Sequence, residues 1–312
     1  MSKKPNVKIY KYQLNDLDDK SRKEEWNNRY RNLNIINQSN QRMKNIEYFE
    51  VFDRYLKNFY SSQKGITRSP RVLELSCGVA PFTRRAIEHN AFALATDYSE
   101  VLINRLTNEL GYNAAVIDLF NINIANDKFD IIVLAGGIYE SDDYTLPKKV
   151  YASIKKLLNE NGIIIQYLNR YDNVANRLMS YHEKTRLLLN PKYYNFVRKL
   201  FGKKPLKKCH LLWLMPVSYV CNCATTEGLT VVSINPMRLI CGVLDSIMYG
   251  FYPFKFFPFK DPDFFNDDSA ERDKNKIFSR PFLSFINFIS QRNKLCFELS
   301  KSCCIVFSNK KP

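Results

Sequence analysis

Runs of apolar residues alternate with helix-like segments through the middle of the chain, and this alternation restricts the fold more than any other feature. The apolar runs occupy residues 72–75, 91–97, 113–118, 129–137 and 163–169, and the helix-like segments occupy residues 81–90, 99–110 and 146–162. Strands that read as continuous apolar runs are typical of a parallel sheet covered by helices on both faces. The order of segments therefore predicts a doubly wound α/β fold.

The flanking segments extend this core. Residues 19–60 have apolar side chains at helical spacing, so residues 1–60 are predicted to form a helical N-terminal segment. The main domain is predicted to span residues 61–312. Within it we expect a basic and aromatic cap insertion at about 171–215 and an extended aromatic-rich region at about 236–295. A chain of 312 residues with 45% apolar content is long enough for one such domain.

The net charge of +16 is unevenly distributed. Residues 1–60 carry 13 basic and 8 acidic side chains, residues 61–170 carry 12 of each, and residues 171–312 carry 22 basic and 11 acidic. From Lys184 to Lys208 there are nine basic residues and no acidic one. This asymmetry favours an anionic partner, with a solvated lysine surface as the alternative.

The sequence predicts a cytoplasmic protein. It shows no secretion signal, and no apolar run approaches the roughly 18 residues of a membrane span. Its eight cysteines have no disulfide-like spacing, which indicates reduced thiols. The aromatic stretch at residues 249–265 is interpreted as a loop packed on the domain, as a lid over an acceptor or as a surface for peripheral contact with a membrane.

No metal site is predicted. One group of residues invites comparison with a zinc site: Cys209, His210, Cys221 and Cys223. Because Cys221 and Cys223 lie two apart in a helix-like segment, they point about 200° apart and cannot easily share one metal ion.

The segment RVLELSCGVAPFT, residues 71–83, joins the first apolar run to the first helix-like segment. An acidic residue is followed by small residues at alternate positions: Glu74, Ser76, Gly78 and Ala80. Glycines in such loops allow unusual dihedrals and close approach to a ligand, and Ser and Ala are the next smallest residues. Asp97 follows about twenty residues later at a strand end, where a carboxylate can accept from both ribose hydroxyls. The absence of G-x-G-x-x-G disfavours a nicotinamide dehydrogenase.

Across nearly its whole length the chain resembles the class I S-adenosylmethionine-dependent methyltransferases of the small-molecule type. VLELSCGVAPFT resembles the first motif of that family, LATDYSEVLI the second and VIDLF the third. FDIIVLAGG resembles the fourth, and LLNENGIII resembles the run before the fifth strand. The resemblance implies a Rossmann-like sheet of seven strands, mostly parallel, whose last strand in residues 303–311 is antiparallel. It also implies S-adenosyl-L-methionine as the cofactor.

The resemblance further implies roles for individual residues. Glu74 would reach the methionine end of the cofactor, and Asp97 would hold the ribose. Asp118 and the backbone of Leu119 would read the adenine edge, and Ala135 and Gly136 near the end of the fourth apolar run would line the pocket beside the sulfonium. The implied cofactor-binding residues are Glu74, Ser76, Gly78, Ala80, Asp97, Tyr98, Asp118, Leu119, Ala135 and Gly136.

Two residues are predicted to be catalytic. Glu140 follows the fourth apolar run, where open α/β sheets place their active sites. His210 opens a segment that resembles the family's passage into its sixth strand. Either side chain could remove a proton from an acceptor. The alternatives are a solvated loop carboxylate for Glu140 and a packed ring for His210.

The predicted acceptor is a small molecule or metabolite, methylated on oxygen. The basic cap favours an anionic acceptor with phosphate or carboxylate, such as a glycan or lipid-linked precursor. AGGIYES lacks the N/D-P-P-Y/F tetrad of enzymes that methylate exocyclic amines of nucleic acids. Two alternatives stay open: an RNA methyltransferase, suggested by the net charge although no RNA-binding domain is recognisable, and a cofactor-binding protein without catalysis, suggested by the substituted glycines.

Overall fold

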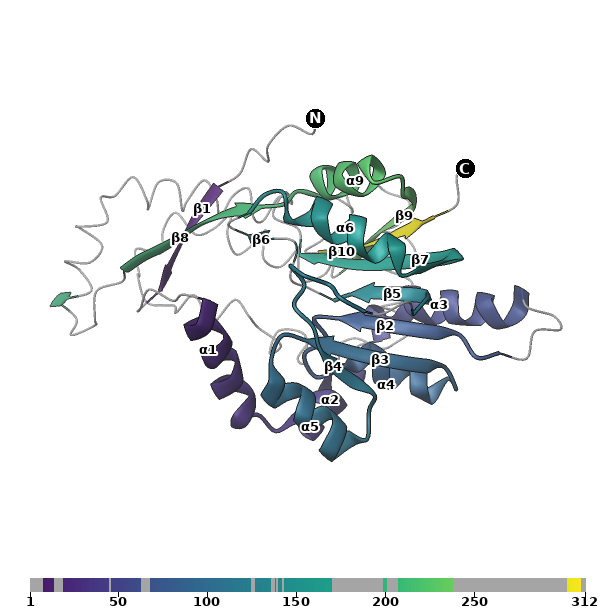
Figure 1. The fold of residues 1–312 in the computed structure, drawn as a ribbon, viewed down its shortest axis with the longest axis horizontal. Helices are drawn as coiled ribbons and strands as arrows, with labels where there is room; N and C mark the ends of the chain where they lie inside the picture. Colours follow the sequence, from purple (N-terminus) through teal and green to yellow (C-terminus); the bar gives the residue numbers. More distant parts are fainter. Residues whose placement is uncertain are drawn as a thin grey trace, which may run out of the picture.

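The computed structural model contains a seven-stranded sheet with helices on both faces and a smaller second sheet (Figure 1). The structure describes residues 8–13, 19–44, 46–62, 68–124, 127–135, 138, 140–141, 143–169, 199–200, 207–237 and 302–309. Within these ranges, no helix combines the length and the apolar character needed to cross a membrane.

The seven strands are ordered β4-β3-β2-β5-β7-β10-β9 across the large sheet. Their bounds are β2 Arg71–Leu75, β3 Phe92–Asp97, β4 Ala114–Val116, β5 Phe129–Leu134, β7 Leu158–Asn169, β9 Thr230–Met237 and β10 Ser302–Ser308. Strands β4, β3, β2, β5 and β7 are parallel, whereas β10 runs antiparallel to both of its neighbours. The predicted doubly wound, Rossmann-like sheet with an antiparallel last strand is confirmed.

The described helices begin and end close to the predicted positions in most places. They are α1 Asp19–Arg31, α2 Ile35–Met43, α3 Ile46–Ser62, α4 Pro81–Glu88, α5 Glu100–Leu110, α6 Leu146–Lys156 and α9 Val217–Thr226. Pro81 lies in the first turn of α4, where its missing N–H is not needed. Ser99 caps α5 by accepting a hydrogen bond from the backbone nitrogen of Leu102.

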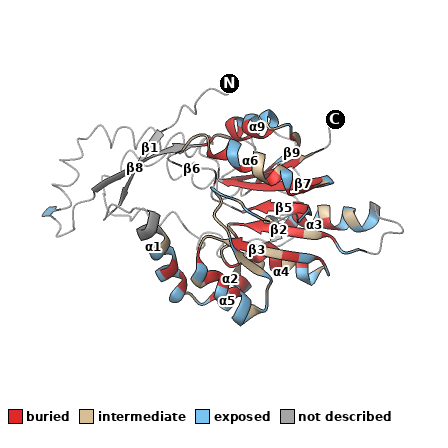
Figure 2. Ribbon diagram, viewed as in Figure 1, coloured by how far each residue is buried: buried red, intermediate tan, exposed pale blue. Residues whose placement is uncertain are grey.

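The core has two layers because the central strands are covered on both faces. In β5, Ile131 and Val133 pack with α3 and α4, while Ile132 and Leu134 pack with α6 and α9. Neighbouring residues of a strand point to opposite faces, so a strand covered on both sides is apolar at most of its positions. Figure 2 shows the consequence: buried residues fill the central strands β2 and β5, and exposed residues lie on the outer faces of the helices.

The second sheet joins segments that are distant in the sequence. It consists of β1 Lys8–Gln13, β8 Lys207–Leu214 and β6 Glu140–Ser141, in the order β1-β8-β6. The prediction of a helical segment over residues 1–60 is therefore wrong for β1. Its pairing partner is β8, far along the chain, and local periodicity cannot reveal such a partner.

The predicted helix over residues 146–162 is also too long. Leu158 already pairs with Phe129 at the start of β5, and the side-chain nitrogen of Asn159 donates to the carboxylate of Asp130 at 2.7 Å. These tertiary hydrogen bonds override the local helical preference, which is a weak constraint on a few residues.

Several predicted features lie outside the described residues. They are most of the basic run Lys184–Lys208, the aromatic stretch 249–265 and Gly136. The expectations about them stay predictions.

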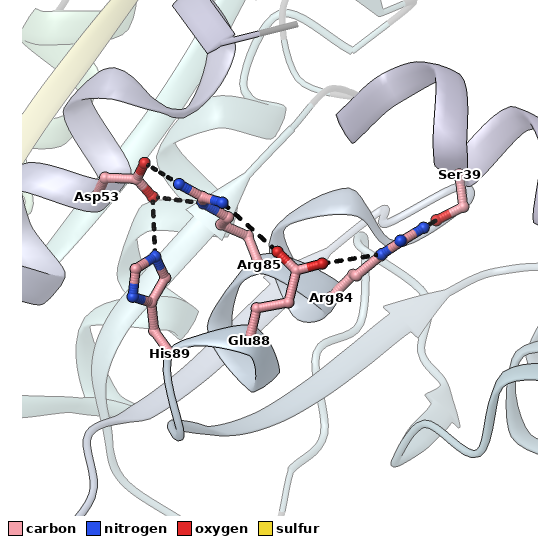
Figure 3. A network of polar contacts seen from close by, with 6 residues as sticks. All are labelled: Ser39, Asp53, Arg84, Arg85, Glu88 and His89. Atoms are coloured by element: carbon pink, nitrogen blue, oxygen red, sulfur yellow. Dashed lines mark hydrogen bonds and ion pairs between the residues drawn. The ribbon is translucent and has the colours of Figure 1, made fainter. Parts of the chain in front are cut away.

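A network of charged side chains fastens α4 to the N-terminal helices (Figure 3). Arg85 donates to both carboxylate oxygens of Asp53 on α3, at 2.9 and 2.7 Å. Arg84 reaches Ser39 of α2, and Glu88 accepts from both arginines. Since α4 starts at the loop after β2, this network connects the N-terminal helices to the loop that carries the first motif.

Candidate cofactor site

The carboxyl ends of β2, β3, β4 and β5 lie side by side at one edge of the large sheet. Leu75 of β2 pairs with Thr96 of β3 and with Leu134 of β5, and Asp97 pairs with Val116 of β4. The residues that follow these strands therefore meet at one edge, where open α/β sheets bind their ligands. The predicted residues at this edge are Ser76, Gly78, Ala80, Asp97, Tyr98, Asp118, Leu119 and Ala135.

The loop between β2 and α4 has a left-handed backbone at three alternate positions. The φ angle is 52° at each of Ser76, Gly78 and Ala80. A residue with a Cβ atom costs about 1–2 kcal/mol in this conformation. Surrounding hydrogen bonds hold it, including Cys77 N to Thr96 O at 2.9 Å. The loop thus has a left-handed backbone at all three motif positions although two of them carry Ser and Ala.

The carboxylate of Glu74 is fully buried and holds the first turn of α4. One oxygen accepts from the backbone nitrogen and the hydroxyl of Thr83, both at 2.7 Å, and the other accepts from Phe82 N at 3.3 Å. A carboxylate at a helix N-terminus satisfies free N–H groups and complements the helix dipole. Burial raises the pKa of Glu74 to about 7, against the lowering effect of the hydrogen bonds from Thr83 and Phe82. Its expected contact with the methionine end of a cofactor stays a prediction.

The carboxylate of Asp97 faces the loop from the end of β3. Its two oxygens accept from Gly78 N and Ser99 N, each at 3.1 Å. Burial raises the pKa of Asp97, against the lowering effect of hydrogen bonds from the backbone of Ser99, Gly78 and Tyr98. An ionised carboxylate has about four lone-pair directions, so capacity remains for a further donor. None of the ion pairs between described residues includes Asp97.

The remaining predicted residues follow the strands β3, β4 and β5 at the same edge of the sheet. Tyr98 is half-buried, and the amino group of Lys23 on α1 lies 5.5 Å from the centre of its ring. Asp118 accepts from the backbone nitrogen two residues further on at 2.8 Å, which turns the chain after β4. Leu119 and Ala135 pack against the two core layers. These contacts fix the edge around Asp97 and leave the roles of the individual residues as predictions.

The second sheet gives the backbone positions of the two predicted bases. Glu140 pairs with Leu214 on β8, and His210 pairs with Lys11 on β1. Positions 210 and 214 are separated along β8 by about 13 Å at the usual rise of a strand. Glu140 and His210 therefore belong to one sheet but are not neighbours in it.

Metal ligation has no support in the described part of the chain. Cys221 and Cys223 both lie on α9, and no group of three or more His, Cys, Asp or Glu residues there could hold a metal ion. Cys77 is buried in the loop, and burial raises the pKa of its thiol well above the usual value, helped by Asp97 and Glu74. A thiol in this state is a poor nucleophile and a poor metal ligand.

The sequence analysis did not predict that α1 contributes residues to this site. A Cβ atom built on Gly78 would lie 3.9 Å from the hydroxyl oxygen of Tyr30. Asn27, also on α1, accepts from the hydroxyl of Ser99 at 2.7 Å. No spacing rule connects α1 to a loop so much further along the chain. The available signal was a pair of aromatic residues in an otherwise polar helix.

Comparison with known proteins gives likeness in structure only. No family model matches the chain, and no curated protein matches it. Among solved structures, a putative sarcosine dimethylglycine methyltransferase from Galdieria sulphuraria is 10% identical to this chain. Its TM-score is 0.44, and the match covers 83% of this chain and 85% of that protein's chain. An S-adenosylmethionine-dependent methyltransferase from Clostridium acetobutylicum is 12% identical to this chain, with a TM-score of 0.44. The match covers 82% of this chain and 90% of that protein's chain.

A third solved structure, the [4+2]-cyclase SpnF, is 10% identical, with a TM-score of 0.41, covering 83% of this chain and 81% of its own. Such low identities and scores say nothing about activity. It has to be inferred from the residues of the site.

Replacing Ala80 with Gly tests the strain in the loop. Ala80 and Ala86 are both fully buried, but Ala80 has a left-handed backbone and Ala86 lies inside α4. Both Ala→Gly changes remove one buried methyl group. We expect Ala80→Gly to lower the free energy of unfolding by about 2–3 kcal/mol less than Ala86→Gly, because the first change relieves about 1–2 kcal/mol of strain and the second adds about 1 kcal/mol for a glycine inside a helix. Urea titrations measure both. A difference of about 1 kcal/mol or less would mean that the loop is not strained.

The pH dependence of stability tests the state of Glu74. Its pKa is raised to about 7 in the folded protein from an ordinary value of 4.5. The folded state therefore holds the proton more tightly, and stability from this group is lost as pH rises from about 4.5 to about 7. The difference in unfolding free energy between wild type and Glu74→Gln should change over that window and stay constant above it. A constant difference from pH 4 to 8 would contradict the raised pKa.

Proposed function

We propose that the protein is a class I S-adenosyl-L-methionine-dependent methyltransferase. One observation carries the proposal: the three positions that match the glycines of the first motif all have a left-handed backbone, and Asp97 accepts from the middle one. Small residues at these positions allow a ligand to approach the backbone closely. The hydrogen bond from Gly78 N holds the carboxylate of Asp97 beside that backbone, where it could bind a ribose.

The residues at the sheet edge fit the proposed cofactor. Asp97 would accept hydrogen bonds from the ribose hydroxyls, and Gly78 would allow the cofactor to approach the loop. Asp118 and the backbone of Leu119 would bind the adenine edge. When bound, S-adenosyl-L-methionine supplies an electrophilic methyl group on a positively charged sulfur. Ala135, after β5, would line the space beside that sulfur.

The protein's own contribution to transfer would be alignment and proton removal. In-line displacement requires the acceptor atom to be held opposite the leaving sulfur. Of the two predicted bases, we favour Glu140, because it follows β5 by few residues and pairs with β8 beside the start of α9. It would accept the proton of a hydroxyl acceptor. His210 lies four residues before Leu214 on β8, and it would border the acceptor instead.

We further propose that the acceptor is a small anionic molecule, methylated on oxygen in the cytoplasm. The support is the charge distribution: residues 61–170, which form the candidate cofactor site, carry no net charge, whereas residues 171–312 carry the largest excess of basic side chains. A phosphate- or carboxylate-bearing acceptor would be drawn toward that part of the chain.

The Asp97→Asn variant tests the cofactor site. It keeps the size of the side chain and removes the charge that would accept from the ribose. We expect the affinity for S-adenosylhomocysteine in calorimetry to fall by about 1.5–3 kcal/mol, the value of a hydrogen bond to a charged group.

The matched control is Asp127→Asn, which removes an exposed carboxylate paired with Arg71 at 2.8 Å, before the start of β5. The control should bind like the wild type. If wild type binds neither S-adenosylmethionine nor S-adenosylhomocysteine, the proposed function is wrong. If the wild type binds and Asp97→Asn binds equally well, the cofactor lies elsewhere.

Removing the charges of the basic run tests the proposed acceptor. In one variant five lysines of the run become Gln, and in the control five exposed lysines outside it become Gln. The first set is Lys199, Lys203, Lys204, Lys207 and Lys208, and the control set is Lys44, Lys57, Lys148, Lys149 and Lys156. We expect the first variant to have a higher KM for an anionic acceptor, with an effect that shrinks as salt screens charges over about 8 Å.

Before an acceptor is identified, the same variants can be tested for binding to anionic vesicles and to RNA. Loss of vesicle binding alone would indicate an acceptor at the membrane surface. Loss of RNA binding alone, with a steep salt dependence in the wild type, would favour an RNA acceptor. An unchanged KM for every acceptor would mean that the basic run is only a solvated surface.

A further inference from the structure

We infer that the hydroxyl of Tyr30 is a second ribose-binding group, which donates a hydrogen bond to a ribose hydroxyl while Asp97 accepts from the ribose. This inference rests on the proposed function, because it assigns one more residue to the same nucleoside site. It places α1, which precedes the large sheet in the sequence, in direct contact with the cofactor.

The position of Tyr30 is the first support. Its hydroxyl oxygen lies 3.9 Å from the point where a Cβ on Gly78 would stand. Gly78 is the residue whose backbone nitrogen donates to Asp97 at 3.1 Å. The phenol and the carboxylate thus approach the same peptide from two different elements, α1 and the end of β3.

The second support is that the ring is held in place before any ligand binds. The guanidinium of Arg105 on α5 donates to the backbone oxygens of Tyr30 and Leu33, which fixes the last turn of α1. The Tyr30 ring stacks on Trp26 with centroids 5.9 Å apart and an angle of 23°. One helical turn away, Asn27 accepts from Ser99 at 2.7 Å. A group held in this way loses little freedom when it binds.

The third support is the pairing of donors and acceptors. An ionised carboxylate can only accept, whereas each ribose hydroxyl can both donate and accept. The nearest backbone donors, Gly78 N and Ser99 N, are already bonded to Asp97. The contacts of Tyr30 with described residues involve its carbonyl and its ring, and its hydroxyl hydrogen bonds to none of them. Among the described residues, that hydroxyl is therefore a donor available to a ribose bound at Asp97.

The protonation state agrees with this role. Burial raises the pKa of Tyr30, and the neighbouring charge of Asp97 raises it further. The phenol therefore keeps its proton across the neutral range and remains a donor. A tyrosine ionised beside Asp97 would instead repel the carboxylate and could not donate to the ribose.

The test compares Tyr30→Phe with Tyr112→Phe by calorimetry with adenosine, 2′,3′-dideoxyadenosine and S-adenosylhomocysteine. Tyr30→Phe removes one oxygen and keeps the ring. Tyr112 packs against the same core cluster as Tyr30, but its hydroxyl bonds to Ser39 on α2. We expect Tyr30→Phe to weaken adenosine and S-adenosylhomocysteine by roughly 3- to 10-fold, the value of one neutral hydrogen bond. Its affinity for the dideoxy compound should equal that of the wild type, and Tyr112→Phe should bind all three normally.

The outcomes separate this inference from the proposed function. If wild type binds S-adenosylhomocysteine and Tyr30→Phe binds all ligands equally well, Tyr30 does not bind the ribose and the proposed function stands. An equal loss for adenosine and dideoxyadenosine would show that the substitution only disturbs α1, and would also overturn the inference. If wild type binds none of the three, both proposals fail together.

Discussion

The buried carboxylate of Glu74 is the interaction on which the candidate site depends. Glu74 is the last residue but one of β2, and its side chain holds the backbone of Phe82 and Thr83 in the first turn of α4. Because this side chain ties the end of β2 to the start of α4, the five loop residues 76–80 have little freedom. The left-handed conformation of Ser76 and Ala80, which each residue would avoid in isolation, follows from this closure.

The loop in turn organises its surroundings. Its central nitrogen, at Gly78, fixes one oxygen of Asp97, and Ser99 N fixes the other. The hydroxyl of Ser99 accepts from Leu102 N at the start of α5, and it donates to Asn27 on α1. One chain of hydrogen bonds therefore runs from β2 through the loop and the end of β3 to α1. Each of its links is a hydrogen bond from a backbone nitrogen or between two side chains, and none is an ion pair.

Much of the large sheet was predictable because its signals are local. Each central strand is covered on both faces, so β5 had to be a continuous apolar run, and Ser99 and Pro81 mark helix starts by their own chemistry. The positions of Ser76, Gly78, Ala80 and Asp97 were also predictable, since the motif is short and its spacing reflects one strand-loop-helix unit. Two predictions were wrong, the helix that covers the start of β7 and the helical segment that covers β1. Both strands depend on pairing partners elsewhere in the chain.

The sequence by itself determined the parallel sheet, the loop that follows its first strand and the carboxylate at the end of the next one, because periodicity and side-chain size act over a few residues. Only the tertiary structure decided that Glu74 faces α4, that β1 pairs with β8, and that Tyr30 lies beside Gly78. Hydrogen bonds and packing between distant segments are fixed by the closure of the whole chain. A local pattern of residues does not indicate which distant segment a strand or side chain will contact.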